Sequence, residues 1–255
     1  MSTIKRICVY AGSNPGNDDC YRTAAQNLAH TLVRLGIGIV YGGGNVGLMG
    51  ELADTVLAAG GEVVGIMPRQ LVEKEVAHLG LTDLHVVESM HERKAAMAEL
   101  SDAFVALPGG IGTLEEIIEV YTWSQLGLHR KACALLNING YYDGLTAFLD
   151  HAVSEGFLAR GHRELLVVID RPEELVESLE RWDPPRLDMA LGPETPDQSA
   201  YLLTPGIRLD QTIPAMPVRD ASAAVAFYRD RLGFEVLHHD GGFAVMCRDE
   251  AVLHL

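Results

Sequence analysis

The most constraining feature of the sequence is the stretch at residues 103–116, which reads AFVALPGGIGTLEE. An apolar run typical of a buried strand ends at Pro108, and glycines at 109, 110 and 112 precede a segment with helical periodicity. Glycine lets the backbone come close to a ligand, and the unpaired amides of a starting helix attract anions. The stretch therefore predicts a strand, a tight loop and a helix N-terminus that form a phosphate site. The alternative is an ordinary strand-to-helix turn, which needs one glycine rather than three followed by two carboxylates.

Strand-like and helix-like segments alternate through residues 1–182. We expect strands at 4–10, 38–41, 62–67, 84–87, 103–107, 133–138 and 165–169, and helices at 20–35, 48–59, 90–100, 114–126, 142–155 and 172–182. This alternation predicts an α/β fold, a Rossmann-like parallel sheet with helices on both faces and right-handed crossovers. Ligands bind such sheets at the carboxyl ends of the strands. Loops that contain Gly12, residues 42–47 and residues 109–112 would gather there around a nucleotide-sized pocket.

The pattern changes after residue 182. Residues 183–211 are rich in proline and lack periodicity, so we interpret them as a linker. Residues 212–255 then predict a β-α-β-β-β unit, with strands at 212–218, 234–238, 242–247 and 251–255 and a helix at 221–232. A unit of this size seldom buries enough surface to be stable alone. Because the sequence stops inside a predicted strand, we expect this fragment to belong to a larger domain.

Composition excludes several classes of function. The chain has 255 residues, a formal net charge of −15 and a pI near 5.0, which argues against a protein that binds nucleic acid through its phosphates. The four cysteines contain no C-x-x-C pair, so we expect buried free thiols rather than a zinc cluster or a disulfide framework. The N-terminus carries no signal region, and no segment approaches the length of a membrane span. We expect a cytoplasmic protein that binds no membrane.

Three other nucleotide or metal motifs are absent or lack a residue that their site requires. Residues 42–47 satisfy G-x-G-x-x-G after a strand, but the next strand begins with Glu62 and ends in Met67 and Pro68, where a dinucleotide site needs an acidic residue. No Walker sequence is present, so a mononucleotide fits better. His91 and Glu92 lack a second histidine four residues on, which excludes a zincin.

Two pairs of charged residues are candidates for catalysis. Arg93 and Lys94 open a helix near the expected pocket and would both reach a phosphate only from its first turn; the alternative is a solvated basic helix end. Glu115 and Glu116 are expected in the first turn of their helix, where the dipole favours ionised carboxylates; the alternative is capping. A carboxylate beside a bound nucleotide would order water and stabilise a ribosyl cation, as cleavage of an N-glycosidic bond requires.

Several motifs in order resemble the lonely-guy (LOG) family of cytokinin riboside 5′-monophosphate phosphoribohydrolases, long labelled lysine decarboxylases. Residues 108–116 match its PGGxGTxxE signature, and residues 12–13, 42–44, 46–50, 90–94 and 122–127 match further segments, so that the resemblance covers about 4–182. It implies a homodimer or higher oligomer that hydrolyses N6-substituted AMP, and often AMP, to free base and ribose 5-phosphate, without a metal or cofactor.

The resemblance also implies roles for individual residues. Arg93 and Glu116 match the catalytic pair. The matched substrate contacts are Gly12, Ser13, Gly43, Gly44, Lys94, Gly109, Gly110, Ile111, Gly112, Thr113, Leu114, Glu115 and Thr122. One further acidic contact falls within residues 69–77, where Glu73 and Glu75 are both candidates. Our hypothesis is that Gly110, Gly112 and Thr113 hold the 5′-phosphate, Glu116 orients water and steadies the ribosyl cation, and Arg93 adds charge at the phosphate or leaving group.

Two alternative functions follow from the same residues. A lysine decarboxylase needs a Schiff-base lysine with a supporting site for pyridoxal phosphate, and Lys94 beside Arg93 is a poor candidate. Relatives that resemble molybdenum-cofactor carriers would use the phosphate loop for binding without hydrolysis. The complete signature together with Arg93 favours the enzyme.

Residues 213–255, with FYRDRLGF at 227–234, resemble the first module of the vicinal-oxygen-chelate superfamily of glyoxalases and bleomycin-resistance proteins. That superfamily pairs two such modules, and one is present here. Ile213 occupies the position where metal-dependent members have histidine, so the resemblance implies a metal-free, binding-type module. We do not expect His238, His239 or His254 to bind metal, because lone histidines on short strands are more often solvated or hydrogen-bonded.

Overall fold

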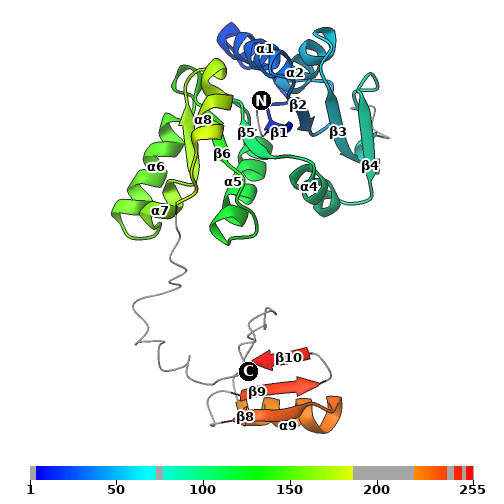
Figure 1. Cartoon of the computed structure of the whole chain (residues 1–255), viewed down its shortest axis with the longest axis vertical. Helices are drawn as coiled ribbons and strands as arrows, with labels where there is room; N and C mark the ends of the chain where they lie inside the picture. Colours follow the sequence, from blue (N-terminus) through cyan, green and yellow to red (C-terminus); the bar gives the residue numbers. More distant parts are fainter. Residues whose placement is uncertain (1–3, 73–76, 186–220, 240–243, 249–250, 255) are drawn as a thin grey trace. The chain divides into compact units, whose positions relative to one another are not determined.

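The protein is described here from a computed structural model, which defines residues 4–72, 77–185, 221–239, 244–248 and 251–254. The chain divides into two compact units, Met1–Met189 and Ala190–Leu255 (Figure 1). The strands of the first unit are β1 (Arg6–Tyr10), β2 (Gly38–Tyr41), β3 (Val63–Pro68), β4 (Asp83–Val87), β5 (Ala103–Ala106), β6 (Cys133–Leu136) and β7 (Leu166–Ile169). Its helices are α1 (Asp19–Arg34), α2 (Gly47–Ala58), α3 (Arg69–Val72), α4 (Met90–Glu99), α5 (Ile111–Gln125), α6 (Asp143–Ser154), α7 (Arg160–Arg163) and α8 (Leu175–Arg181), with 3-10 turns at Ile138–Gly140 and Pro172–Glu174.

All seven strands of the first unit pair in parallel, in the order β4-β3-β2-β1-β5-β6-β7. The Rossmann-like α/β fold is therefore confirmed. The chain builds the sheet outward from β1 to β4 and then returns to place β5 on the other side of β1. The connections that leave β1 and β5 diverge, so their carboxyl ends form the switch point at which ligands bind in this kind of sheet.

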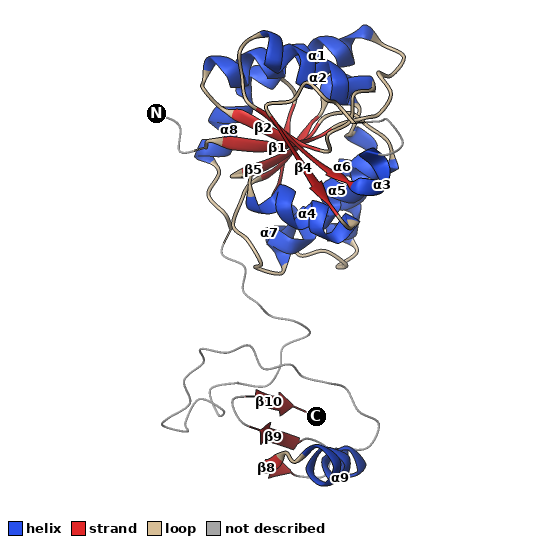
Figure 2. Ribbon diagram, turned by 90° about the vertical axis from the view of Figure 1, so that its right-hand side faces the viewer, coloured by secondary structure: helices blue, strands red, loops and turns tan. Residues whose placement is uncertain are grey.

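Helices cover both faces of the sheet (Figure 2), and side chains of the central strands alternate between two apolar cores, one on each face. In β1, Ile7 and Val9 join the core beneath α1, α2 and α8, whereas Cys8 and Tyr10 join the core beneath α4, α5 and α6. A strand buried on both faces needs apolar residues at every position, because its side chains point alternately to opposite faces. Central strands of this composition predict the observed two-layer cover of helices.

The start of α5 differs from the prediction. We expected the helix to begin near residue 114, but it begins at Ile111, because the Leu114 amide already donates to the Gly110 carbonyl at 3.1 Å. The prediction that Glu115 and Glu116 lie in the first turn is therefore wrong: the first turn of α5 holds no acidic residue. The short helices α3 and α7 were also not predicted, since four residues are too few to show a period.

The second unit has α9 (Ala221–Leu232), β8 (Glu235–His239), β9 (Ala244–Arg248) and β10 (Ala251–His254). Its strands form an antiparallel sheet in the order β10-β9-β8, with Val225, Ala244 and Met246 in a small core. The strand expected at 212–218, residues 186–211 of the expected linker, Glu73 and Glu75 all lie outside the described residues. Across the described ranges, no helix combines the length and the apolar character that crossing a bilayer requires.

Candidate active site

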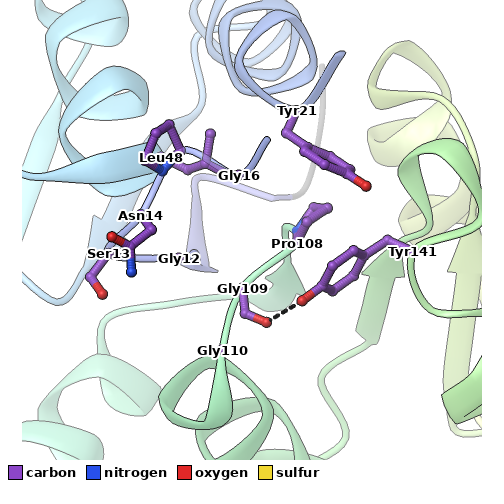
Figure 3. A pocket seen from close by; sticks show the side chains of 11 residues that line it. Gly12, Ser13, Asn14, Gly16, Tyr21, Leu48, Pro108, Gly109, Gly110 and Tyr141 are labelled. Atoms are coloured by element: carbon purple, nitrogen blue, oxygen red, sulfur yellow. Dashed lines mark hydrogen bonds between the residues drawn. The ribbon is translucent and has the colours of Figure 1, made fainter. Parts of the chain in front are cut away.

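The loops that follow β1 and β5 lie against each other at the switch point. The Leu107 amide donates to the Tyr10 carbonyl at 2.9 Å, and the Gly12 amide donates to the Pro108 carbonyl at 3.2 Å. These loops border a cavity of about 190 Å³ whose lining includes Ser13 and Gly110 (Figure 3). The predicted convergence of the first and fifth strand loops is thus present in the fold.

The three glycines between the end of β5 and the first turn of α5 are there for different reasons. A Cβ atom on Gly109 would overlap the Thr113 side chain and the Gly12 amide, so the fold itself requires glycine at this position. A Cβ atom on Gly110 or Gly112 would meet nothing within 4 Å. Packing therefore does not explain these two glycines, whereas close approach of a ligand to the backbone would.

The N-terminus of α5 is suited to an anion. Its N-cap residue, Gly110, offers no side-chain hydrogen bond to the first amides, and the first turn holds no acidic side chain. The amides and the positive end of the helix dipole are therefore not compensated from within the helix. A phosphate placed here would receive these amides. Thr113, predicted to contribute its hydroxyl, is only 4% exposed and packs against Gly109.

Arg93 and Glu116 form a buried ion pair beside this helix. Arg93 lies near the start of α4, which Ser89 caps by accepting the Glu92 amide at 3.1 Å. The Arg93 guanidinium donates to a Glu116 carboxylate oxygen at 2.8 Å and to the Ile66 carbonyl at 3.1 Å. The two side chains are only 11% and 14% exposed, so water screens the pair weakly. The predicted catalytic pair is thus a single unit that joins α4, α5 and the end of β3.

Burial dominates the titration of Glu116. Desolvation raises the pKa of its carboxyl, and the Arg93 guanidinium pulls the pKa only part of the way back. A carboxylate in this setting changes charge at a higher pH than a solvated glutamate does. It also interacts strongly with any positive charge that develops nearby, because a buried charge is weakly screened by water.

Lys94 belongs to a separate, more exposed cluster on the same two helices. Its ammonium lies 2.5 Å from Glu115 and 3.2 Å from Glu119. The hydrogen bond with Glu115 is the main cause that raises the Lys94 pKa. A lysine that forms a Schiff base needs a lowered pKa, so these residues do not fit pyridoxal phosphate. In the described ranges, no group of three or more His, Cys, Asp or Glu residues is arranged to hold a metal ion.

The remaining predicted contacts are not all at the switch point. Gly43 and Gly44 are buried. The Gly43 carbonyl accepts a hydrogen bond from the His78 amide at 2.8 Å, and the Gly44 carbonyl accepts one from the Tyr41 hydroxyl at 3.1 Å. Thr122 lies three turns along α5 from the glycine loop, and its hydroxyl donates to the Ile118 carbonyl at 2.7 Å. The structure does not bring Thr122 to the loop within this chain.

The structure adds residues that the sequence did not single out. A Cβ atom on Gly42 would overlap the Arg93 guanidinium, so this glycine makes room for the ion pair. Glu119 completes the Lys94 cluster, and its spacing four residues after Glu115 was the available signal. Tyr141 lines the switch-point cavity from the loop after β6, and the position after a parallel strand was its only signal.

Known proteins are similar to both parts of this chain. A family model described as "Possible lysine decarboxylase" matches residues 49–179, and one described as "Bleomycin resistance protein-like N-terminal" matches residues 212–247. A protein of Oryza sativa subsp. japonica named a probable cytokinin riboside 5′-monophosphate phosphoribohydrolase is 50% identical over 184 residues, which cover 72% of this chain and 81% of the rice protein. A cytokinin riboside 5′-monophosphate phosphoribohydrolase of Arabidopsis thaliana is 48% identical over 183 residues, or 72% of this chain and 80% of that protein.

A solved structure of the molybdenum cofactor carrier protein from Chlamydomonas reinhardtii is similar with a TM-score of 0.52 and 17% identity, over 69% of this chain and 96% of that one. At this identity the likeness shows a shared fold alone. The identity to the plant proteins is much higher and extends over 72% of this chain. The chain belongs to the LOG family, whose curated members are named cytokinin riboside 5′-monophosphate phosphoribohydrolases.

Proposed function

We propose that this protein hydrolyses the N-glycosidic bond of AMP or N6-substituted AMP, releasing the free base and ribose 5-phosphate. The observation that carries this proposal is the buried Arg93–Glu116 pair next to the uncapped, glycine-rich start of α5. The start of α5 suits a phosphate, and the Glu116 carboxylate of the pair suits a positive charge that develops on a ribose. The names of the plant relatives support the same reaction.

In the proposed reaction the 5′-phosphate binds the amides at Gly110–Gly112, which fixes the ribose beside Glu116. The ionised carboxylate orients a water molecule toward C1′ and stabilises the oxocarbenium-like transition state. The bond between C1′ and N9 breaks, the water oxygen joins C1′, and the proton lost by water ends on the departing base. Arg93 keeps Glu116 in position and holds it ionised against the effect of burial.

Chromatographic detection of products tests the reaction. The protein is incubated with AMP and with isopentenyladenosine 5′-monophosphate, beside an Arg93→Ala, Glu116→Gln double variant and a Glu99→Gln control that removes an exposed charge from the end of α4. We expect base and ribose 5-phosphate in equal amounts from the parent and the control, and none from the double variant. A parent that binds AMP without releasing base would contradict hydrolysis and favour a carrier.

We also propose that the protein acts as a cytoplasmic homodimer or higher oligomer. Leu126 and Leu128, at the end of α5, are 56% and 70% exposed, which suits an interface better than a solvated surface. Cys8, Cys20 and Cys133 are free thiols, as expected in a reducing compartment. Light scattering at a series of concentrations, with activity measured in parallel, tests the oligomer. Full activity in a monomeric sample would contradict a role for the dimer in catalysis.

A further inference from the structure

We propose that Tyr141 is a positioning residue for the phosphate site, because its hydroxyl ties back the carbonyl of Gly109 and so fixes the loop that presents the Gly110–Gly112 amides. This inference rests on the proposed function in treating that loop as the phosphate site. Tyr141 lies at the switch-point cavity and reaches across it to Gly109 (Figure 3). The hydroxyl donates to the Gly109 carbonyl oxygen at 2.6 Å, which is a short distance for an O–H···O hydrogen bond.

The turn that carries Tyr141 is built to hold one conformation. Asn139 has a φ of 53°, an uncommon backbone state for a residue other than glycine, and Gly140 follows with a φ of 71°. The Asn137 side chain accepts the Tyr142 amide at 2.7 Å and donates to Asp143 at 2.8 Å, closing the turn at the start of α6. Strained residues held by their surroundings often occur at functional sites.

The ring of Tyr141 is fixed as well as its backbone. It meets Tyr21 of α1 edge-on, with ring centroids 5.8 Å apart, and Tyr142 edge-on at 5.0 Å. Three elements therefore determine where the hydroxyl lies: α1, the β6–α6 turn and the glycine loop. Yet Tyr141 is 43% exposed, so packing of a core does not explain why the ring is held.

The hydrogen bond has an electrostatic consequence for an anion. The Gly109 carbonyl oxygen carries partial negative charge and belongs to the same peptide unit as the Gly110 amide. A peptide unit that rotated would turn this oxygen toward a bound phosphate and the amide away from it. The Tyr141 hydroxyl both neutralises the oxygen and blocks the rotation, so the loop is prepared for the anion before the anion arrives.

The neighbouring residue provides a matched control. Tyr142 also donates its hydroxyl to a carbonyl of the same segment, that of Leu107 at 2.7 Å, but Tyr142 is 2% exposed and lies in the core. Removing either hydroxyl deletes one hydrogen bond to this segment. Tyr142→Phe should therefore mainly lower stability, and Tyr141→Phe should mainly weaken anion binding.

The test measures binding of ribose 5-phosphate and of inorganic phosphate by calorimetry, which does not depend on turnover, together with melting temperature. For Tyr141→Phe we expect both dissociation constants to rise by about 3- to 10-fold, as the loss of one hydrogen bond implies. We expect its melting temperature to equal that of the parent. For Tyr142→Phe we expect a lower melting temperature and dissociation constants within about twofold of the parent, since its bond lies in the core.

Three results would overturn the inference: unchanged phosphate binding in Tyr141→Phe, a loss of stability in Tyr141→Phe that matches the loss in Tyr142→Phe, or a parent that binds neither ligand. Absence of base release by a parent that binds phosphate contradicts the proposed reaction and leaves the Tyr141 measurement fully interpretable.

Discussion

At the residue scale, burial separates two adjacent glutamates that look alike in the sequence. Glu115 is half exposed and neutralises Lys94, whereas Glu116 is 14% exposed and pairs with Arg93. Water screens the charge of the first and leaves that of the second strong. Of the two, Glu116 is therefore the residue suited to stabilise a cation.

The raised pKa of Glu116 predicts the pH dependence of base release. If the ionised carboxylate acts on the ribose, kcat/KM falls as the pH drops through the Glu116 pKa, which burial raises above the ordinary value of 4.5. The charge of Glu115 also raises the Glu116 pKa, although less than burial does. Glu115→Gln should therefore move the acid limb of the pH profile to lower pH. An unmoved or upward-shifted limb would show that Glu116 does not determine it.

Breaking the ion pair should cost stability as well as activity. Arg93→Ala leaves Glu116 buried without its partner, and breaking such a pair typically costs about 3 kcal/mol of the free energy of unfolding. The double variant Arg93→Ala, Glu116→Gln removes the uncompensated charge and should recover part of this loss. Urea denaturation of the parent, both single variants and the double variant measures the coupling. Additive losses would mean that the two charges do not interact in the folded protein.

At the scale of the element, the α5 N-terminus contains glycines with opposite structural demands. Gly109 is required by contacts with Thr113 and Gly12, while Gly112 has open space around it and lies within the helix. Gly112 weakens the helix, and packing gives no reason for glycine there. Such a conflict between helix propensity and the observed fold is expected at functional sites.

Alanine substitutions should separate these demands. Gly112→Ala should stabilise the ligand-free protein by about 0.5 kcal/mol, because alanine is the better helix former, and should weaken ribose 5-phosphate binding. Gly109→Ala should destabilise the protein, since its Cβ atom has no space. Thermal melting with and without ribose 5-phosphate distinguishes the cases. If Gly112→Ala bound the ligand as tightly as the parent, the ligand would not approach this glycine.

At the scale of the whole molecule, the unit that carries the candidate site and the C-terminal unit have separate cores. The cores of the first unit end with Leu179 and the partly buried Trp182, which packs against both of them, whereas Val225, Ala244 and Met246 form the core of the second. We propose the division into residues 1–182, a linker at 183–211 and a module at 212–255. The site described above draws on the first region alone.

A fragment that ends at Met189 tests this division. It keeps Trp182, so we expect it to unfold in one cooperative transition and to release base with a kcat/KM within about twofold of the full chain, because all groups of the site are retained. The full chain, assayed in parallel, is the control. A folded but inactive fragment would show that the C-terminal region contributes to catalysis.

Periodicity and glycine spacing act over a few residues, so the alternation of strands and helices, the parallel sheet and the glycine-rich loop after the fifth strand could be predicted from the sequence alone. The sequence motifs also indicated the family, and that resemblance singled out Arg93 and Glu116, which the structure then shows as an ion pair. The strand order, the space that Gly42 leaves for Arg93 and the hydrogen bond from Tyr141 to Gly109 became apparent only in the folded structure. These depend on contacts between residues 19 or more positions apart in the chain, and no local pattern records such contacts.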